Sequence, residues 1–243
     1  MVPLQVEKQF LYKYAVDIDT AITRHTFTCM RNAGYTTAFV RIYQPHGNGI
    51  VDIHALSNLE NAHNAGLGVE VFVVPQPQGT KSGSVQFDEA YNFMKNNDIT
   101  VNTMWIQITS PINWPNNQQA NIAFIQDFMI RAKQYRVNVG LYTNWYDWQQ
   151  ITANWSKCSL QQLLLWYWNV YGQGPSAINA SNFEDFRPFA GFTTPAVKQY
   201  SQGVSVCGAY VNQNVYSAVA SQSTTSSTVN KTIIVGTIVG SLN

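Results

Sequence analysis

The residues best suited to chemistry lie where predicted strands end. Asp17 closes an apolar strand predicted over Leu11 to Asp19. A carboxylate at the end of such a strand is costly to bury unless it has a partner or a task. Asp17 is therefore the one strong catalytic candidate, and its alternative role is an ion pair with Arg41 of the neighbouring strand.

The stretch from Thr103 to Trp114 supplies further polar groups. It is predicted to be a buried strand that stops at Ser110-Pro111, because proline removes a backbone donor and restricts the preceding residue. With a period of two, one face carries polar groups beside an indole: Trp105, Gln107 and Thr109. The other face is apolar and can pack under helices: Met104, Ile106 and Ile108. An active site, if present, is expected at the end of this strand.

Aromatic, amide and basic side chains follow the other strand ends. The candidates for substrate binding are Arg41, Tyr43, Tyr142, Asn144, Trp145, Trp166 and Trp168. Aromatic rings can stack on the apolar faces of sugars, and amides can bond their hydroxyls, so the set indicates a saccharide groove. For Trp105 and Trp166 the alternative is a place in the core, since small barrels are filled by side chains. Asp19 and Asp147 are interpreted as cap residues of the helices that follow them.

The elements that must position these residues alternate along the chain. Strands are predicted at 35–43, 69–74, 137–142, 163–170, 197–200 and 207–211, besides the two above. Helices are predicted at 20–32, 53–65, 84–95, 117–135 and 147–155. Such alternation predicts a mostly parallel sheet, and the number of strands predicts an α/β fold of the distorted (β/α)8 barrel type. An open doubly wound sheet is the alternative. No glycine-rich nucleotide motif follows the first strand.

The composition of the chain limits the classes of binding partner that we expect. Charged residues make up only 11% and aromatic residues 13%, with a net charge of +1. This balance predicts no nucleic-acid partner and no membrane surface, and it is typical of secreted proteins that handle carbohydrates. The four histidines, at positions 25, 46, 54 and 63, show no ligand spacing, so we predict no metal and no cofactor.

Three segments and one disulfide are expected. Residues 1–10 form an N-terminal extension without the apolar run of a signal peptide, residues 11–216 form the barrel, and residues 217–243 form a flexible tail rich in Ser and Thr. In a barrel, Cys29 late in the first helix and Cys207 at the start of the last strand both fall near the bottom face. We therefore predict a Cys29–Cys207 disulfide and a free Cys158.

Taken in order, several stretches resemble the glycoside hydrolase family 25 lysozymes, above all their invertebrate and protist branch. They are Tyr14-Ala-Val-Asp-Ile, Gly34-Tyr-Thr-Thr-Ala-Phe-Val-Arg, Gly140-Leu-Tyr-Thr-Asn-Trp, Leu165-Trp-Tyr, Lys198-Gln-Tyr, Cys207-Gly and Val211-Asn-Gln-Asn-Val-Tyr. The resemblance covers about Tyr12 to Tyr216. It implies a flattened barrel and cleavage of peptidoglycan between N-acetylmuramic acid and N-acetylglucosamine. It also implies secretion. We expect a monomer that works outside the cell or in digestive vesicles, with a role in antibacterial defence or digestion.

The resemblance also places catalytic carboxylates, and most of them are missing here. Asp17 matches the family's Asp at the end of the first strand. Gln107 and Thr109 stand where the family has Asp-x-Glu, and Asn212 stands where it has another Asp. Loss of a general acid costs about 10² to 10⁴ in rate, so muramidase activity is in doubt. The alternative is an inactive, lectin-like protein on a lysozyme scaffold.

Overall fold

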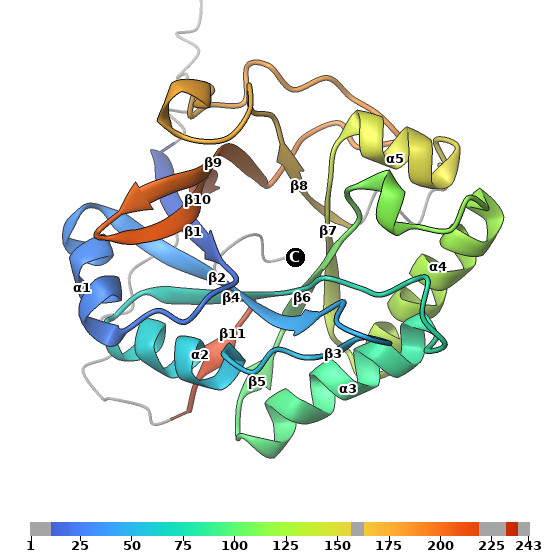
Figure 1. The fold of residues 1–243 in the computed structure, drawn as a ribbon, viewed down its shortest axis with the longest axis horizontal. Coiled ribbons are helices and arrows are strands. Elements are labelled where there is room, and N and C mark those ends of the chain that lie inside the picture. The colour runs from blue at the N-terminus through green and yellow to red at the C-terminus, as the bar shows by residue number, and fades with distance from the viewer. Residues whose placement is uncertain (1–10, 157–162, 219–231, 238–243) are drawn as a thin grey trace, which may run out of the picture.

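The computed structural model describes residues 11–156, 163–218 and 232–237, and eight of its strands close into a barrel (Figure 1). In order around the barrel they are β1 (Leu11–Ile18), β10 (Ala209–Ala218), β9 (Val197–Val206), β8 (Leu164–Trp168), β7 (Asn138–Thr143), β6 (Thr103–Gln107), β4 (Gly68–Val73) and β2 (Tyr35–Gln44). β1 also pairs with β2, which closes the ring and excludes the open sheet. The predicted distorted barrel is confirmed: neighbouring strands are parallel except that β10 is antiparallel to both β1 and β9.

Five helices connect successive parallel strands and pack on the outside of the barrel (Figure 1). They are α1 (Arg24–Asn32), α2 (Ala55–Asn64), α3 (Gly83–Asn96), α4 (Gln118–Gln134) and α5 (Trp145–Thr152). Side-chain oxygens of Thr23 and Asn144 accept backbone N–H groups at the starts of α1 and α5. The prediction that Asp19 and Asp147 cap these helices is therefore wrong. In the described part of the β8–β9 connection, the helical element is a single turn at Pro175–Ala177.

The strands divide the core into an inner and an outer layer. The outer layer lies between strands and helices and includes Met104, Ile106 and Ile108. The inner layer fills the barrel with Ala15, Phe39, Phe72, Trp105, Tyr142, Trp166, Val197 and Tyr216. The two predicted faces of β6 are thus confirmed. Gly140 on β7 makes room for the inner layer, since a Cβ there would lie 2.1 Å from the indole of Trp105.

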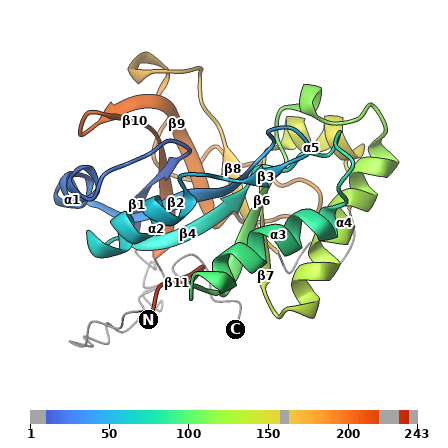
Figure 2. The ribbon, with the colours of Figure 1, turned by 60° about the horizontal axis from the view of Figure 1, so that its bottom comes forward.

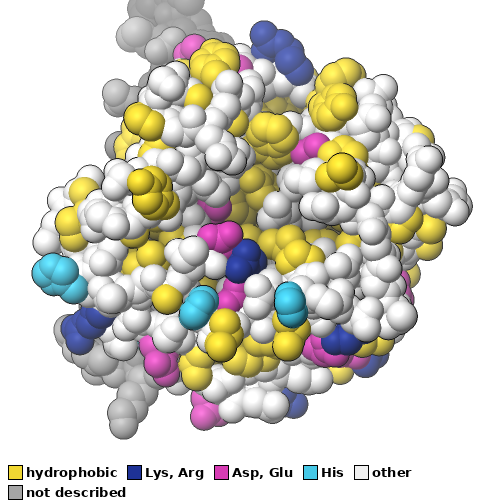
Figure 3. All heavy atoms as spheres, in the orientation of Figure 1, with side chains coloured by type: hydrophobic (Ala, Val, Ile, Leu, Met, Phe, Trp, Pro, Cys, Tyr) yellow, Lys and Arg dark blue, Asp and Glu magenta, His cyan; other side chains and the backbone are white. Residues whose placement is uncertain are grey.

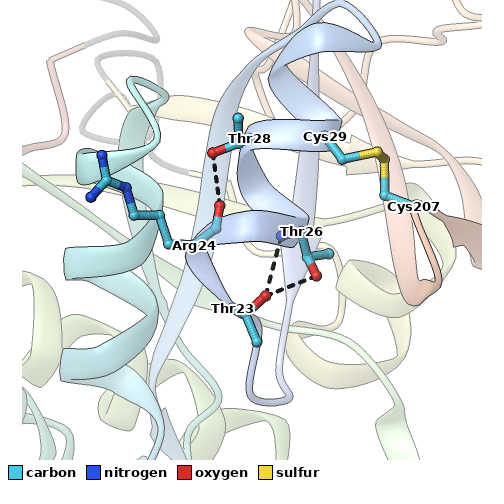
Figure 4. Close-up of a disulfide and its surroundings, with 6 residues drawn as sticks. All are labelled: Thr23, Arg24, Thr26, Thr28, Cys29 and Cys207. Atoms are coloured by element: carbon cyan, nitrogen blue, oxygen red, sulfur yellow. Dashed lines mark hydrogen bonds between the residues drawn. A yellow bond between two sulfur atoms is a disulfide. The ribbon is translucent and has the colours of Figure 1, made fainter.

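The predicted Cys29–Cys207 disulfide is present, with a Cα–Cα distance of 6.0 Å (Figure 4). Its position differs from the expectation. Cys207 does not begin a strand at the bottom of the barrel but lies in the turn between β9 and β10, past the carboxyl ends of the parallel strands. The bond therefore holds the tip of the β9–β10 hairpin against α1. Cys158 lies outside the described residues.

Part of the predicted flexible tail is an ordered strand. β11 (Ile234–Val235) pairs in parallel with β5 (Thr100–Val101), which precedes β6. Figure 2 shows β11 on the opposite side of the barrel from β3 (Ile50–Val51), which pairs antiparallel with the end of β2. A Cβ on Gly236 would lie 2.3 Å from the backbone nitrogen of Thr103, so only glycine allows this approach. Composition alone gave no sign of this docking, because it depends on an edge formed by distant residues.

None of the described helices combines the length and apolar character needed to cross a membrane.

The docked strand gives a test of the fold. Val235 is fully buried and Ile234 beside it is 48% exposed. We expect Val235→Asp to cost about 2 kcal/mol, the value of one buried aliphatic side chain, because the segment would detach rather than bury the charge. For a chain of this size that lowers Tm by roughly 4 to 8 °C. Ile234→Asp is the matched control and should change Tm little in thermal unfolding followed by circular dichroism. Equal shifts in the two variants would contradict the docking.

Candidate functional site

Asp17 lies inside the barrel at the end of β1, and its carboxylate is held by three amides. Gln199 on β9 donates to Oδ1 at 2.8 Å, Asn214 on β10 donates to Oδ1 at 2.7 Å, and Asn212 on β10 donates to Oδ2 at 2.7 Å. The side chain is buried, with 5% exposure. The alternative ion pair with Arg41 is wrong, since each hydrogen-bond donor found on this carboxylate is an amide.

The orientations of the two Asn amides are set by a second ring of donors. The indole of Trp166 donates to Asn214 Oδ1 at 2.8 Å. The backbone N–H of Gly203 donates to Asn212 Oδ1 at 3.0 Å. With its carbonyl oxygen engaged in this way, each amide must turn its NH₂ group toward Asp17.

Gln199 is fixed by the same principle. Its Oε1 accepts from the hydroxyl of Tyr142 at 2.8 Å and from the amide of Gln202 at 2.5 Å. Its NH₂ group is therefore directed at Asp17. The surroundings of Asp17 present donors, so they match a carboxylate that accepts, and they leave part of Oδ2 to accept from a ligand.

Two opposing effects act on the ionisation of Asp17. Burial raises the pKa of Asp17 above its ordinary value, and the hydrogen bonds from Asn214, Asn212 and Gln199 oppose that rise. The nearby charge of Asp19 adds to the rise.

A cleft opens above Asp17 at the carboxyl ends of the strands. One hollow, of about 460 Å³, is lined by residues that include Asp17, Asp19, Arg41, Gln107, Tyr142, Gln202 and Asn212. A second hollow, of about 280 Å³, shares Gln107 with the first and reaches Thr109, Ser110 and Trp114. Figure 3 shows the hollow in the middle of this face, with hydrophobic side chains in its depth and acidic and basic side chains beside it. The two hollows form one cleft across the strand ends.

Gln107 and Thr109 face this cleft together. The amide of Gln107 donates to the hydroxyl of Thr109 at 2.8 Å, and the indole of Trp114 donates to the Thr109 carbonyl at 3.1 Å. Neither side chain of the pair has a proton that it can release near neutral pH. Both can still form hydrogen bonds with a ligand.

Arg41 lies at the edge of the cleft, and its guanidinium is held by ion pairs within the protein. Its Nε donates to Asp52 at 2.6 Å and its Nη1 donates to Asp19 at 3.1 Å. Its Nη2 donates to the backbone carbonyl of Asp19 at 2.8 Å. Asp19 is thus a partner of Arg41 on the cleft wall.

The predicted binding residues separate into three groups. Arg41 and Tyr142 line the cleft. Asn144, Trp145 and Trp168 line a different hollow on the same side of the barrel. Two residues are corrected because they are fully buried: the Tyr43 hydroxyl donates to Glu89 at 2.6 Å on the outside of the barrel, and Trp166 lies in the inner layer.

Sequence reasoning missed Asn214. The signal was available, because Asn212 and Asn214 are two residues apart on one strand and therefore share a face. Asn214 lies inside the barrel, where it bonds Asp17 and Trp166.

Asp147 is the second buried carboxyl of this region, with 2% exposure. It is the third residue of α5, after the cap residue Asn144. It accepts from the indole of Trp168 at 2.9 Å and from the backbone N–H of Ser110. Ser110 has a φ of 56°, so this contact holds a strained corner after β6. Burial raises the pKa of Asp147 to about 6.

Among the described residues, no three His, Cys, Asp or Glu side chains are grouped so that they could hold a metal ion.

Comparison with known proteins places the chain among lysozyme relatives. The family model described as "Lysozyme-like protein 1" matches residues 8–200. "Lysozyme-like protein 7" of Caenorhabditis elegans is 46% identical over 207 residues, which is 85% of this chain and 73% of that protein. "Probable GH family 25 lysozyme 2" of Dictyostelium discoideum is 33% identical over 202 residues, or 83% of this chain and 89% of that protein. The bacterial lysozyme of Streptomyces coelicolor shares the fold, with a TM-score of 0.66 at 20% identity over 86% of this chain and 93% of that chain.

The pKa of Asp147 predicts how stability depends on pH. A carboxyl whose folded pKa lies above its unfolded value of about 3.9 stabilises the fold as pH falls through the folded value. The free energy of unfolding should therefore rise between pH 7.5 and 5, and Asp17 contributes in the same direction. Two pKa units correspond to about 3 kcal/mol, of which we expect ~1 to 2 after solvent screening.

Asp147→Asn should reduce this rise, as measured by urea unfolding at several pH values between 7.5 and 5. The exposed Glu60→Gln is the control and should keep the wild-type dependence. An unchanged rise in Asp147→Asn would show that this carboxyl is not the responsible group.

Proposed function

Because this chain belongs to the lysozyme-like proteins related to the glycoside hydrolase family 25 lysozymes, we propose that it binds a peptidoglycan-type glycan in the Asp17 cleft without efficient hydrolysis. The observation that carries this proposal is the Gln107–Thr109 pair. These side chains bond each other where β6 meets the cleft, the place at which the resemblance to family 25 lysozymes puts the proton donor.

Hydrolysis of a glycosidic bond ordinarily requires a protonated acid and a second carboxylate. In the cleft, the carboxyls among the described lining residues are Asp17 and Asp19. Asp17 is surrounded by amide donors, and Asp19 is paired with Arg41. An amide or a hydroxyl in place of the acid supports a rate loss of about 10² to 10⁴.

The same groups favour binding. Gln107, Thr109 and Asn212 present amides and a hydroxyl to the cleft, which Tyr142 and Phe72 also line although only 5% and 3% of their surface is exposed. Hydroxyl and acetamido groups of amino sugars are neutral donors and acceptors, which amide side chains can bond in both senses. Under this proposal the protein binds bacterial wall glycan in the manner of a lectin.

We further propose that the protein works outside the cell or in digestive vesicles, in antibacterial defence or digestion, as a monomer. The Cys29–Cys207 disulfide supports an oxidising compartment, and the low content of charged residues is typical of secreted proteins that handle carbohydrates. The net charge of +1 favours neither nucleic acid nor a membrane surface as a partner.

Co-sedimentation with purified peptidoglycan, run beside an assay for release of reducing ends, tests the proposal. The wild-type protein should sediment with the wall material and release no reducing ends above background. Release that disappears in Asp17→Asn would instead identify a working hydrolase, and the proposal would be wrong.

Restoring the acids should create activity. We expect Gln107→Asp combined with Thr109→Glu to raise the release of reducing ends by about 10²-fold or more, since a general acid supplies roughly that factor. Gln119→Asp with Thr80→Glu is the matched control: it makes the same changes in charge at exposed positions outside the cleft. The missing acid is not the cause of low hydrolysis if the control pair gives the same increase. The same conclusion follows if the cleft pair gives no increase while the protein still sediments with the wall.

A further inference from the structure

We propose a second carbohydrate site beside the cleft, which takes a neutral amino-sugar ring stacked on Trp145. The site is a hollow of about 420 Å³ between the start of α5, the end of β8 and the segment around Phe186. We call it the aromatic shelf, and its working residues are Trp145, Tyr146, Trp168, Phe186, Asn144 and Asn169. This inference rests on the proposed function and extends it to a longer glycan.

Two large aromatic side chains are left in solvent at the shelf. Trp145 is 53% exposed and Tyr146 is 56% exposed, at the first two positions of α5. Single exposed apolar residues are common, whereas a contiguous exposed apolar patch is one mark of a ligand site. Figure 3 shows hydrophobic side chains on this face near the place that α5 occupies in Figure 1. A flat indole face fits the apolar face of a pyranose ring.

The shelf offers one free donor and one free acceptor. Asn144 Oδ1 accepts from the N–H of Asp147 at 2.8 Å, so the Asn144 NH₂ group is available to a ligand. The Asn169 NH₂ group donates to Asp185 Oδ2 at 2.5 Å, and among the described residues no donor reaches Asn169 Oδ1. A donor and an acceptor beside an aromatic face match a sugar ring with hydroxyl and acetamido substituents.

The charged groups at the shelf already have partners. Asp185 accepts from Lys198 at 2.9 Å and from the hydroxyl of Tyr167 at 2.6 Å. Arg187 donates to the carbonyls of Glu184 and Phe186, at 3.2 and 3.0 Å. A cationic ligand would therefore find no unpaired carboxylate here, whereas a neutral sugar ring needs none.

The floor of the shelf is rigid. Lys198 on β9 is fully buried, and its ammonium also donates to the carbonyl of Ala180 at 2.7 Å. Through Asp185 it anchors the segment that carries Phe186 to the barrel wall. A surface held in place before binding loses less entropy when the ligand arrives.

Asp147 joins the shelf to the cleft. It accepts from Trp168 of the shelf and from Ser110, which lines the cleft beside Gln107. The two sites therefore lie on either side of one buried carboxyl, at the same end of the barrel. Under this proposal, a glycan that leaves the cleft on this side would extend toward Trp145.

Calorimetric titration with β-1,4-linked N-acetylglucosamine hexamer tests the shelf. We expect Trp145→Ala to weaken hexamer binding by about tenfold, which corresponds to ~1.4 kcal/mol. Trp145→Phe should restore part of the affinity. Tyr171→Ala is the matched control: this aromatic is 78% exposed and lines neither site, so its loss should leave the affinity unchanged.

Gln107→Ala in the cleft separates the two proposals. If Trp145→Ala binds like the wild type while Gln107→Ala weakens binding, the shelf is wrong and the proposed function stands. Weakening by Trp145→Ala alone supports the shelf and counts against binding in the cleft. A wild-type protein that binds no hexamer overturns the shelf, whereas the peptidoglycan sedimentation assay still decides the proposed function.

Discussion

The burial of one carboxylate without a cation is the constraint on which this structure depends. Asp17 is 5% exposed and is compensated by three amide hydrogen bonds. Amides can donate or accept, so each must be oriented by a further contact if the carboxylate is to be satisfied. The indole of Trp166, the hydroxyl of Tyr142 and a backbone N–H supply those contacts. The side chains that pack in the inner layer therefore also orient the amides that compensate the carboxylate of Asp17.

The hairpin of β9 and β10 carries all three amides, and this links the site to the closure of the barrel. β10 is the strand that pairs with β1 and so completes the ring. Its antiparallel direction brings Asn212 directly opposite Asp17 in the register. The disulfide at the hairpin turn holds the same element against α1. A change that loosened the hairpin would open the barrel and remove the partners of Asp17 together.

The alternation of residues along strands predicted which side chains face inward for much of the barrel. The prediction failed where a strand departs from its regular geometry. The faces of β6, the barrel and the disulfide follow from period and order along the chain. Tyr43 should share a face with Arg41, but the register of β2 shifts between them, so Tyr43 turns outward to Glu89. Trp166 faces inward as expected, yet Tyr142 stacks on it at 4.1 Å and covers it. The docking of β11 depends on distant partners, which no local pattern records.

Amides in place of acids change the stability of such a site as well as its chemistry. Several carboxylates around one cleft repel one another and compete for protons, which raises their pKa values. With Asn212 beside Asp17, and with Gln107 and Thr109 across the cleft, the charge of Asp19 is the carboxylate repulsion that still acts on Asp17, and three amide donors oppose the effect of burial. Active sites commonly give up stability for function. Under the proposed function, the amide and hydroxyl groups that remain at the cleft are those that would form hydrogen bonds with a glycan. Selection for binding alone would favour this arrangement, and the proposed aromatic shelf would extend the contact along the chain of sugars.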